Sequence, residues 1–143
     1  MGCDIHGHFE IKVDGKWEHY SADRFLRDYS LFAKLANVRN NSLEGDYVQP
    51  IDEPRGLPED ISIVTKMDND HYGTDGHSHS YITAEEITEV HTFHLNTCLD
   101  ARFEVDHMQW GYLFGNGYEG FSKCKDGYPP EIEDLRFVFW FDN

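Results

Sequence analysis

Polar and apolar residues alternate most clearly at the start of the chain, which reads MGCDIHGHFEIKV. Successive side chains of a β-strand point to opposite faces, so residues 3–13 predict a strand with two unlike faces. One face carries four polar groups, Asp4, His6, His8 and Glu10. The other carries Cys3, Ile5, Phe9 and Ile11 and is interrupted by Gly7. We expect the apolar face to pack in the core and the polar face to carry the chemistry.

The next elements follow from turn and cap signals. Asp14-Gly15 is a hairpin signal, which predicts a return strand at residues 17–20. Apolar residues at helical spacing in residues 24–39 predict a helix, with Ser30 as a plausible N-cap and Asn37 near the C-cap. Pro58 and the two acids after it suit the first turn of a short helix that reaches about residue 67.

The second half of the chain predicts more strands and one longer helix. Residues 77–82 alternate like a strand, and the capping box at residues 83–86 opens a helix in which we interpret His91 and His94 as a solvated side. Residues 112–117 predict a strand ending in a turn, and LRFVFWF at residues 135–141 predicts a buried central strand. Because no βαβ rhythm appears, we expect a single α+β domain over residues 1–143. It would have a mainly antiparallel sheet, a few short helices and long loops.

Composition narrows the classes of partner. The 143 residues carry a net charge of −15, from 27 acidic and 12 basic residues, and such a surface repels long DNA or RNA. A small anionic ligand is still compatible with it if arginines converge in one pocket. No apolar run reaches the length of a membrane span. Three widely spaced cysteines predict free thiols in a reducing cytoplasm. Assembly into a homo-oligomer stays open.

The polar face of the first strand, at Asp4, His6, His8 and Glu10, has three interpretations. It could be an exposed polar strand face without a function. Imidazole and carboxylate groups could hold a divalent metal such as zinc or manganese, although no complete ligand signature is present. Paired histidines could instead transfer protons, with an aspartate fixing the tautomer of an imidazole.

A second block, Asp75-Gly-His-Ser-His-Ser80, repeats the D-x-H-x-H spacing. If it is a strand, His77 and His79 share one face, and Asp75 could orient an imidazole as Asp4 could in the first block. We therefore expect the two blocks to meet in neighbouring strands. His77 and His79 join Asp4, His6 and His8 as metal candidates under the metal interpretation.

Residues 40–58 are a long connection rich in proline and glycine, and connections of this length are often functional loops. Arg39 and Arg55 stand at either end of it, and paired guanidinium groups suit phosphate. Arg55 lies between Pro54 and Gly56, close to the helix expected at Pro58. We therefore expect a ligand-covering loop in which Arg55 anchors phosphate beside a helix N-terminus.

Five blocks in order resemble an uncharacterised family of small bacteriophage proteins: MGCDIH, RDYSLFAKLANVRN, RGLPEDIS, YGTDGHSHSYIT and RFVFWFDN. The resemblance covers most of the chain and implies a phage origin and the cytoplasm of an infected bacterium. Its blocks contain Asp60, which joins His8, Arg39 and Arg55 as a ligand-binding candidate. By analogy, small phage proteins of this kind counter host defence by cleaving or sequestering nucleotide immune signals.

Two functions of different classes follow from these patterns. The first is a phosphodiesterase that cleaves a cyclic mononucleotide or dinucleotide, with His6 or His77 as base and His79 as acid. The second is a non-catalytic protein that sequesters a nucleotide, such as an ADP-ribose derivative or a cyclic dinucleotide. Histidine-rich strand faces favour the enzyme, because sequestration does not need paired proton-transfer groups. An inhibitor of a host protein is a third reading that the acidic surface permits.

Overall fold

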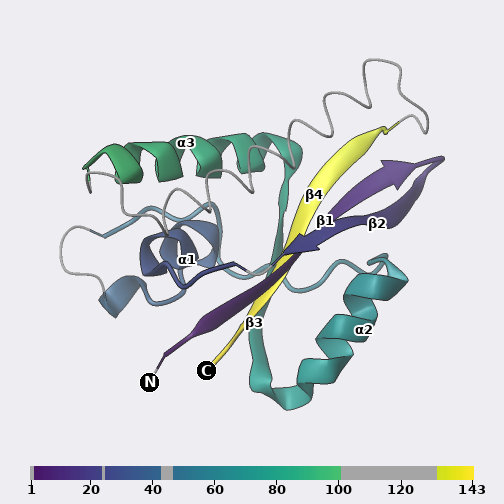
Figure 1. Cartoon of the computed structure of the whole chain (residues 1–143), viewed down its shortest axis with the longest axis horizontal. Helices are drawn as coiled ribbons and strands as arrows, with labels where there is room; N and C mark the ends of the chain where they lie inside the picture. The colour runs from purple at the N-terminus through teal and green to yellow at the C-terminus, as the bar shows by residue number, and fades with distance from the viewer. Residues whose placement is uncertain (1, 24, 43–46, 101–131) are drawn as a thin grey trace.

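Four antiparallel strands form one sheet that lies between α2 on one face and α1 with α3 on the other (Figure 1). The structure, a computed structural model, describes residues 2–23, 25–42, 47–100 and 132–143. The strands, in the order β2-β1-β4-β3, are β1 Asp4–Val13, β2 Lys16–Asp23, β3 Gly76–Thr83 and β4 Asp134–Asp142. The helices are α1 Tyr29–Ala36, α2 Ile63–Tyr72 and α3 Ala84–Asp100, with short 3₁₀ turns η1 Asn40–Ser42 and η2 Gly73–Asp75. The predicted α+β class is confirmed.

The first hairpin forms as its sequence predicts. Asp14 and Gly15 both have positive φ, 49° and 76°, which matches the twist of a tight two-residue turn between antiparallel strands. β1 then pairs with β2 on one side and with β4 on the other, so β1 and β4 are the two central strands. The strands predicted at residues 3–13, 77–82 and 135–141 are all present, whereas residues 112–117 lie outside the described part.

The apolar face of the sheet is covered by α1 and α3. Ile5, Phe9 and Ile11 of β1, and Cys3 just before the strand, are buried there with alternate residues of β4, as the alternation predicts. Gly7 occupies the interrupted position because a Cβ atom there would lie 2.3 Å from the Phe137 ring. The gap in the apolar pattern of β1 is therefore filled by an aromatic ring of the neighbouring strand.

The caps of two helices explain where they begin and end. Asp28, not Ser30, is the N-cap of α1, since its carboxylate accepts hydrogen bonds from the Ser30 and Leu31 amides. Asn37 is the C-cap of α1 with a left-handed φ of 59°. The capping box at α3 forms reciprocally: the Thr83 amide donates to Glu86 Oε1, and the Glu86 amide donates to Thr83 Oγ1.

Two helix predictions need correction. The helix expected from Pro58 begins only at Ile63, because Ser62 is the residue whose hydroxyl caps the Thr65 amide. On α3, His94 is fully buried instead of solvated, because it continues the stripe of Ile87 and Val90 that packs into the core. His91 is half-buried.

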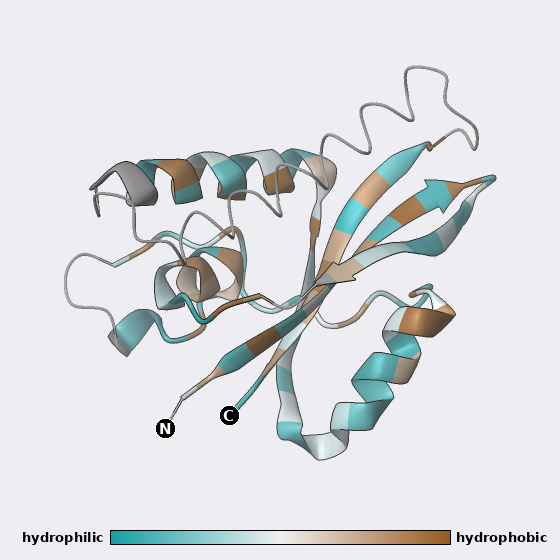
Figure 2. Cartoon of the chain, viewed as in Figure 1, coloured by the Kyte–Doolittle hydropathy of each residue, from teal (hydrophilic) through white to brown (hydrophobic). Residues whose placement is uncertain are grey.

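Helix α2 packs on the sheet with its polar side. Thr65 is its buried residue and contacts Glu10 of the central strand, with Oγ1 donating to Glu10 Oε2 at 2.7 Å. Ile63, Val64 and Met67 are instead exposed, so α2 presents apolar side chains to solvent (brown on α2 in Figure 2). The attachment of α2 therefore depends on hydrogen bonds and ion pairs more than on apolar burial.

Glu10 and Arg136 form the buried centre of this polar face. They are cross-strand neighbours on β1 and β4, and Arg136 Nε and Nη2 lie 2.9 and 2.7 Å from Glu10 Oε1. The other oxygen, Oε2, accepts from the Ser62 amide and the Thr65 hydroxyl at the start of α2. Burial alone would raise the pKa of Glu10, but the hydrogen bonds from Thr65, Ser62 and Arg136 hold it below the ordinary value.

We expect Glu10→Gln to lower the free energy of unfolding at neutral pH by about 3 kcal/mol, because it leaves the buried guanidinium of Arg136 with the exposed carboxylate of Asp60 as its remaining ionic partner among the described residues. The lowered pKa of Glu10 means that this stabilisation is present above the ordinary glutamate pKa and is lost as the pH falls through the lowered value. Urea unfolding at pH 7 and pH 3 measures both effects. The exposed Glu59→Gln is the matched control, and a loss no larger than that of the control would contradict the structural role.

Candidate functional site

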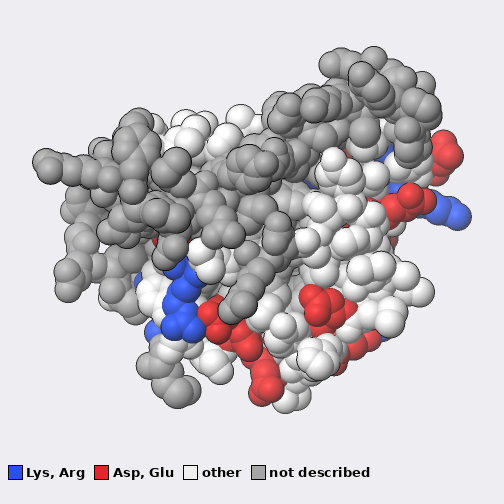
Figure 3. Space-filling model, viewed as in Figure 1, with Lys and Arg blue, Asp and Glu red and all other residues white. Residues whose placement is uncertain are grey.

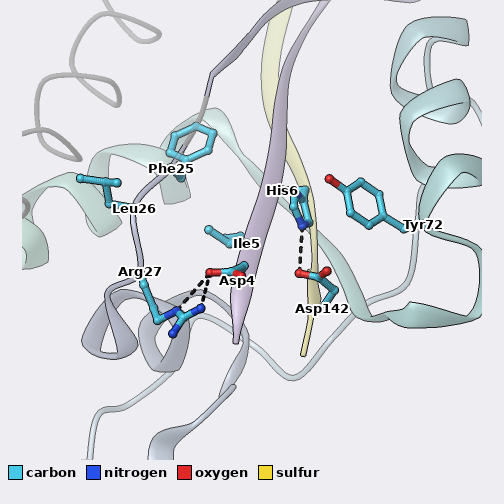
Figure 4. A pocket seen from close by; sticks show the side chains of 8 residues that line it. All are labelled: Asp4, Ile5, His6, Phe25, Leu26, Arg27, Tyr72 and Asp142. Carbon is cyan, nitrogen blue, oxygen red and sulfur yellow. Dashed lines mark hydrogen bonds and ion pairs between the residues drawn. The ribbon is translucent and has the colours of Figure 1, made fainter. Parts of the chain in front are cut away.

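The four polar residues of β1 have different environments along one face of the strand. Glu10 and His8 are buried under α2, whereas His6 and Asp4 lie toward the end of the strand and are partly exposed. The two outer residues line an open pocket of about 580 Å³. The described lining of this pocket is Asp4, Ile5, His6, Phe25, Leu26, Arg27, Tyr72 and Asp142 (Figure 4).

His6 is the histidine of the described pocket lining, and Asp142 of β4 positions it. His6 Nε2 lies 3.0 Å from Asp142 Oδ1, so the ring donates from Nε2 and Nδ1 is its basic nitrogen. Tyr72, from the last turn of α2, packs on the imidazole with 4.0 Å between the ring centroids. Figure 4 shows these three side chains gathered at the end of β1 and β4. Asp142 therefore fixes the tautomer and the orientation of the His6 ring.

Tyr72 contributes a phenol that stays protonated at neutral pH. Its pKa is raised by burial and by the nearby carboxylates of Asp68, Asp142 and Asp4. In Figure 4 its hydroxyl is directed toward His6. The pocket therefore offers a hydrogen-bond donor beside the His6 imidazole.

Asp4 and Arg27 form the other charged pair of the pocket. Arg27 Nε and Nη2 both donate to Asp4 Oδ1, at 3.0 and 2.8 Å. The pair is about half exposed, so its net contribution to stability is small, and an anionic ligand could exchange with Asp4 for the guanidinium. Arg27 follows β2 in the chain, and Gly2 lies so close to it that a Cβ there would overlap the guanidinium.

Charge around this end of the sheet is mixed instead of uniformly acidic. In Figure 3, red and blue side chains adjoin on the part of the face where the chain termini lie in Figure 1. A positive group at this position matters in a chain with a net charge of −15, because a phosphate needs at least one local cation.

His8, although predicted as a ligand-binding or metal candidate, does not line the described part of the pocket. It is 4% exposed, with Nε2 2.7 Å from Asp68 Oδ2 on α2 and Nδ1 3.0 Å from His19 Nε2 on β2. Its ring stacks on Trp140. Both nitrogens are engaged, so His8 attaches α2 and β2 to the sheet instead of binding a ligand.

The second histidine block does not place both of its imidazoles beside His6. A β-bulge lies between His77 and Ser80, and Ser78 has a left-handed φ of 54°, which changes the side-chain alternation of the strand. His77 stacks on Phe141 of the core face and its Nε2 lies 3.1 Å from Asn143 Oδ1. The predicted convergence of His77 with His6 is therefore wrong.

His79 is on the same face of the sheet as His6, with Trp140 between them. The centroids of both imidazoles lie 6.2 Å from that of the indole ring. His79 donates from Nε2 to Asn69 Oδ1 of α2 at 2.9 Å. Burial, with a smaller effect of His77, lowers the pKa of His79, so it is neutral at pH 7. It is absent from the described pocket lining.

The remaining acidic and basic candidates serve other contacts. Asp75 is exposed in η2, before β3. Asp60 accepts from Arg136 Nη1 at 2.9 Å. Arg39 lies over the ring of Tyr29, 5.5 Å from its centroid. None of the three lines the described part of the pocket.

Arg55 is held in an ion pair of the fold, which corrects its predicted role as a phosphate anchor. Its Nη1 and Nη2 donate to the two oxygens of Glu86 at 2.7 Å each, and Nη1 also donates to the Tyr81 carbonyl. The Arg55 amide donates to Ser80 Oγ, and the Gly56 amide to the His79 carbonyl. Residues 55 and 56 therefore fasten the long connection to β3, and no helix begins at Pro58.

The metal interpretation gains no ligand set in the described part of the chain. Among its residues, no group of three or more His, Cys, Asp or Glu side chains is placed to hold a metal ion. Of the five metal candidates, only Asp4 and His6 line the pocket. The His6–Asp142 pair is the geometry on which the proton-transfer interpretation can draw.

Sequence reasoning missed the three other residues of the described pocket lining that have polar side chains, Arg27, Tyr72 and Asp142. Asp142 lies two positions beyond Trp140 on β4, so continuing the strand alternation by one step would have placed it opposite Asp4. Arg27 belongs to the most basic part of the sequence, but nothing local pairs it with Asp4. Tyr72 could not be found from sequence, because the polar attachment of α2 decides where it lies.

Comparison with known proteins gives no family for this chain. No protein-family model, no curated protein and no solved structure matches it. None of the described helices combines the length and the apolar character that crossing a membrane requires.

We expect Arg55→Ala to lower the free energy of unfolding by about 1–3 kcal/mol at pH 7, because Glu86 loses its bidentate partner in a partly buried site. Arg55 holds the pKa of Glu86 below its ordinary value. The difference from wild type should therefore shrink as the pH falls through that lowered pKa. The exposed Lys66→Ala, which breaks the Lys66–Asp70 pair, is the control. Equal stability of the two variants in urea unfolding would contradict this role.

Proposed function

We propose that the chain is a phosphodiesterase that cleaves a small cyclic nucleotide, with His6 as its general base. The observation that carries the proposal is the His6–Asp142 pair, 3.0 Å apart, in an open pocket beside the Tyr72 phenol. In this assignment His6 Nδ1 takes a proton from the attacking water or hydroxyl group, and Asp142 stabilises the imidazolium that forms.

The other groups of the pocket take roles that suit a phosphodiester. Arg27 turns from Asp4 to a phosphate oxygen, to which its fork can donate two hydrogen bonds. Tyr72 donates its proton to the leaving oxygen as the P–O bond breaks, and regains a proton from the His6 imidazolium through solvent. Phe25 and Leu26, on the other side of β1 (Figure 4), form an apolar wall against which a nucleobase could pack.

The resemblance to small phage proteins supports the wider setting of the proposal. In that setting the protein acts in the cytoplasm of an infected bacterium, and its substrate is a cyclic mononucleotide or dinucleotide that signals immunity. Cleavage of the signal would then help the phage to evade host defence.

Sequestration without cleavage is the second candidate, and one observation favours it. His6 is the histidine of the described pocket lining, whereas the acid–base mechanism expected from sequence used two histidines. A protein that only binds a nucleotide would need Arg27, Tyr72 and the apolar wall, but no proton transfer. An ADP-ribose derivative or a cyclic dinucleotide would then be held intact.

One experiment separates the two candidates. The protein is incubated with a panel of cyclic mononucleotides, cyclic dinucleotides and ADP-ribose, and each mixture is analysed by chromatography before and after heat denaturation. New products support the phosphodiesterase. Intact nucleotide that is withheld before heating and recovered afterwards supports sequestration, and free, unchanged nucleotides throughout contradict both.

We expect His6→Asn to lower turnover by about 10²–10⁴-fold, the range for loss of a general base, with binding of the nucleotide less affected. Asp142→Asn should lower turnover as well, because it removes the carboxylate that stabilises the imidazolium. Steady-state kinetics on the nucleotide cleaved in the panel measures both. The matched control is His91→Asn, which changes a half-buried histidine of α3. Unchanged turnover in His6→Asn would show that His6 is not the general base.

A further inference from the structure

Helix α2 carries a stripe of exposed apolar side chains, made of Ile63, Val64 and Met67 (Figure 2). Their exposed fractions are 74%, 46% and 68%. At about 100° per residue, the three lie within roughly 100° of arc around the helix axis. The side of α2 that carries Thr65 is the one that packs on the sheet, so this apolar stripe lies on the opposite side of the helix.

Exposed apolar side chains are otherwise scattered over the described part of the chain. The other large ones there are Tyr20, Tyr47 and Leu95, which lie far apart in the sequence. Single exposed apolar residues are normal on a protein surface, whereas neighbouring ones mark interaction surfaces. Polar contacts attach α2 to the sheet, so the stripe adds little to that attachment. Its apolar area is therefore available to a partner.

Acidic residues border the stripe on both of its long sides. Asp70 lies on one side, and its side chain is 58% exposed. Asp68 lies on the other; it contacts His8 through Oδ2, and its side chain is still 39% exposed. Residues 59–71 contain four carboxylates and one lysine, Lys66, which is paired with Asp70 at 2.9 Å. The stripe is therefore an apolar surface with a negative border.

We propose that this stripe is a docking surface for a basic amphipathic helix of another protein. Ile63 and Met67 are four residues apart and form a ridge of the kind that packs between the side chains of a second helix. Apolar side chains of the partner cover the stripe, as in the recognition of one amphipathic helix by another apolar surface. Lysine or arginine residues beside them meet Asp68 and Asp70, and these charges select the partner.

Charge distinguishes this partner from a second copy of the chain and from a membrane surface. Each copy has a net charge of −15, and a contact between two α2 stripes would bring their acidic borders together. The same border is repelled by anionic lipids. A basic helix gains from both the stripe and its border. The docking surface does not depend on the proposed function, since none of the three stripe residues lines the described part of the pocket.

Fluorescence anisotropy with a synthetic helix tests the proposal on the whole chain. The probe is a labelled peptide of about 14 residues, long enough to span α2, with leucine on one face and lysine on the other. We expect saturable binding that weakens with salt, and much weaker binding of the same peptide with glutamate in place of lysine. The double variant Ile63→Gln/Met67→Gln should weaken binding of the lysine peptide by about tenfold or more, since it removes the central apolar anchors.

The matched control is Leu95→Gln, which removes an exposed apolar side chain of α3 and should leave the affinity unchanged. The melting temperatures of the variants should stay close to that of the wild type, because the changed side chains are largely in solvent. If the double variant does not fold, Met67→Gln alone decides the question, with a smaller loss of affinity expected.

Three results of the peptide titrations would overturn the proposal. These are no saturable binding of the lysine peptide, equal affinity for the wild type and the stripe variant, and an equal loss in Leu95→Gln. Two further measurements cover the other occupants of the stripe. A dimer in sedimentation velocity that the stripe variant abolishes would assign the surface to a second copy. Flotation with phosphatidylcholine vesicles that the variant abolishes would assign it to a membrane, and either result would overturn the basic helix.

Discussion

The buried ion pair of Glu10 and Arg136 is the interaction on which the arrangement of this structure depends. The two residues face each other across the central strands, and both are almost fully buried. A charge in such a position requires further hydrogen bonds, and the start of α2 supplies them through the Ser62 amide and the Thr65 hydroxyl. The need to satisfy Glu10 therefore places α2 on this face of the sheet.

That requirement also explains why α2 is turned with its polar side inward. Its contacts with the sheet are Thr65 to Glu10, Asp68 to His8, Asn69 to His79 and Tyr72 on His6. Each of these residues meets a polar residue or imidazole of the strands, so the polar face of β1 is matched by a polar face of the helix. Different interactions therefore attach the helices to the two faces of the sheet. Apolar packing attaches α1 and α3, whereas hydrogen bonds attach α2.

Sequence patterns predicted those parts of the fold that depend on neighbours along the chain. The β1 alternation, the Asp14-Gly15 turn and the Thr83–Glu86 capping box are local, and all three are present. The parts that failed depend on distant partners. Ser78 takes a positive φ where β3 meets β4 and so separates His77 from His79. Arg55 forms its ion pair with Glu86, which lies 31 residues further along the chain.

The candidate site follows from a gradient along one face of β1. The exposed fraction of the side chain rises from 0% at Glu10 to 6% at His8, 23% at His6 and 55% at Asp4. The strand alternation alone made these four residues look equivalent.

Where α2 covers the strand, every polar atom of Glu10 and His8 must be paired inside the protein, which leaves nothing for a ligand. Where the cover ends, at Tyr72, His6 keeps one nitrogen for chemistry while Asp142 still fixes its orientation. The end of α2, at Tyr72 before the Gly73 cap, therefore decides which histidine of the strand faces the open pocket.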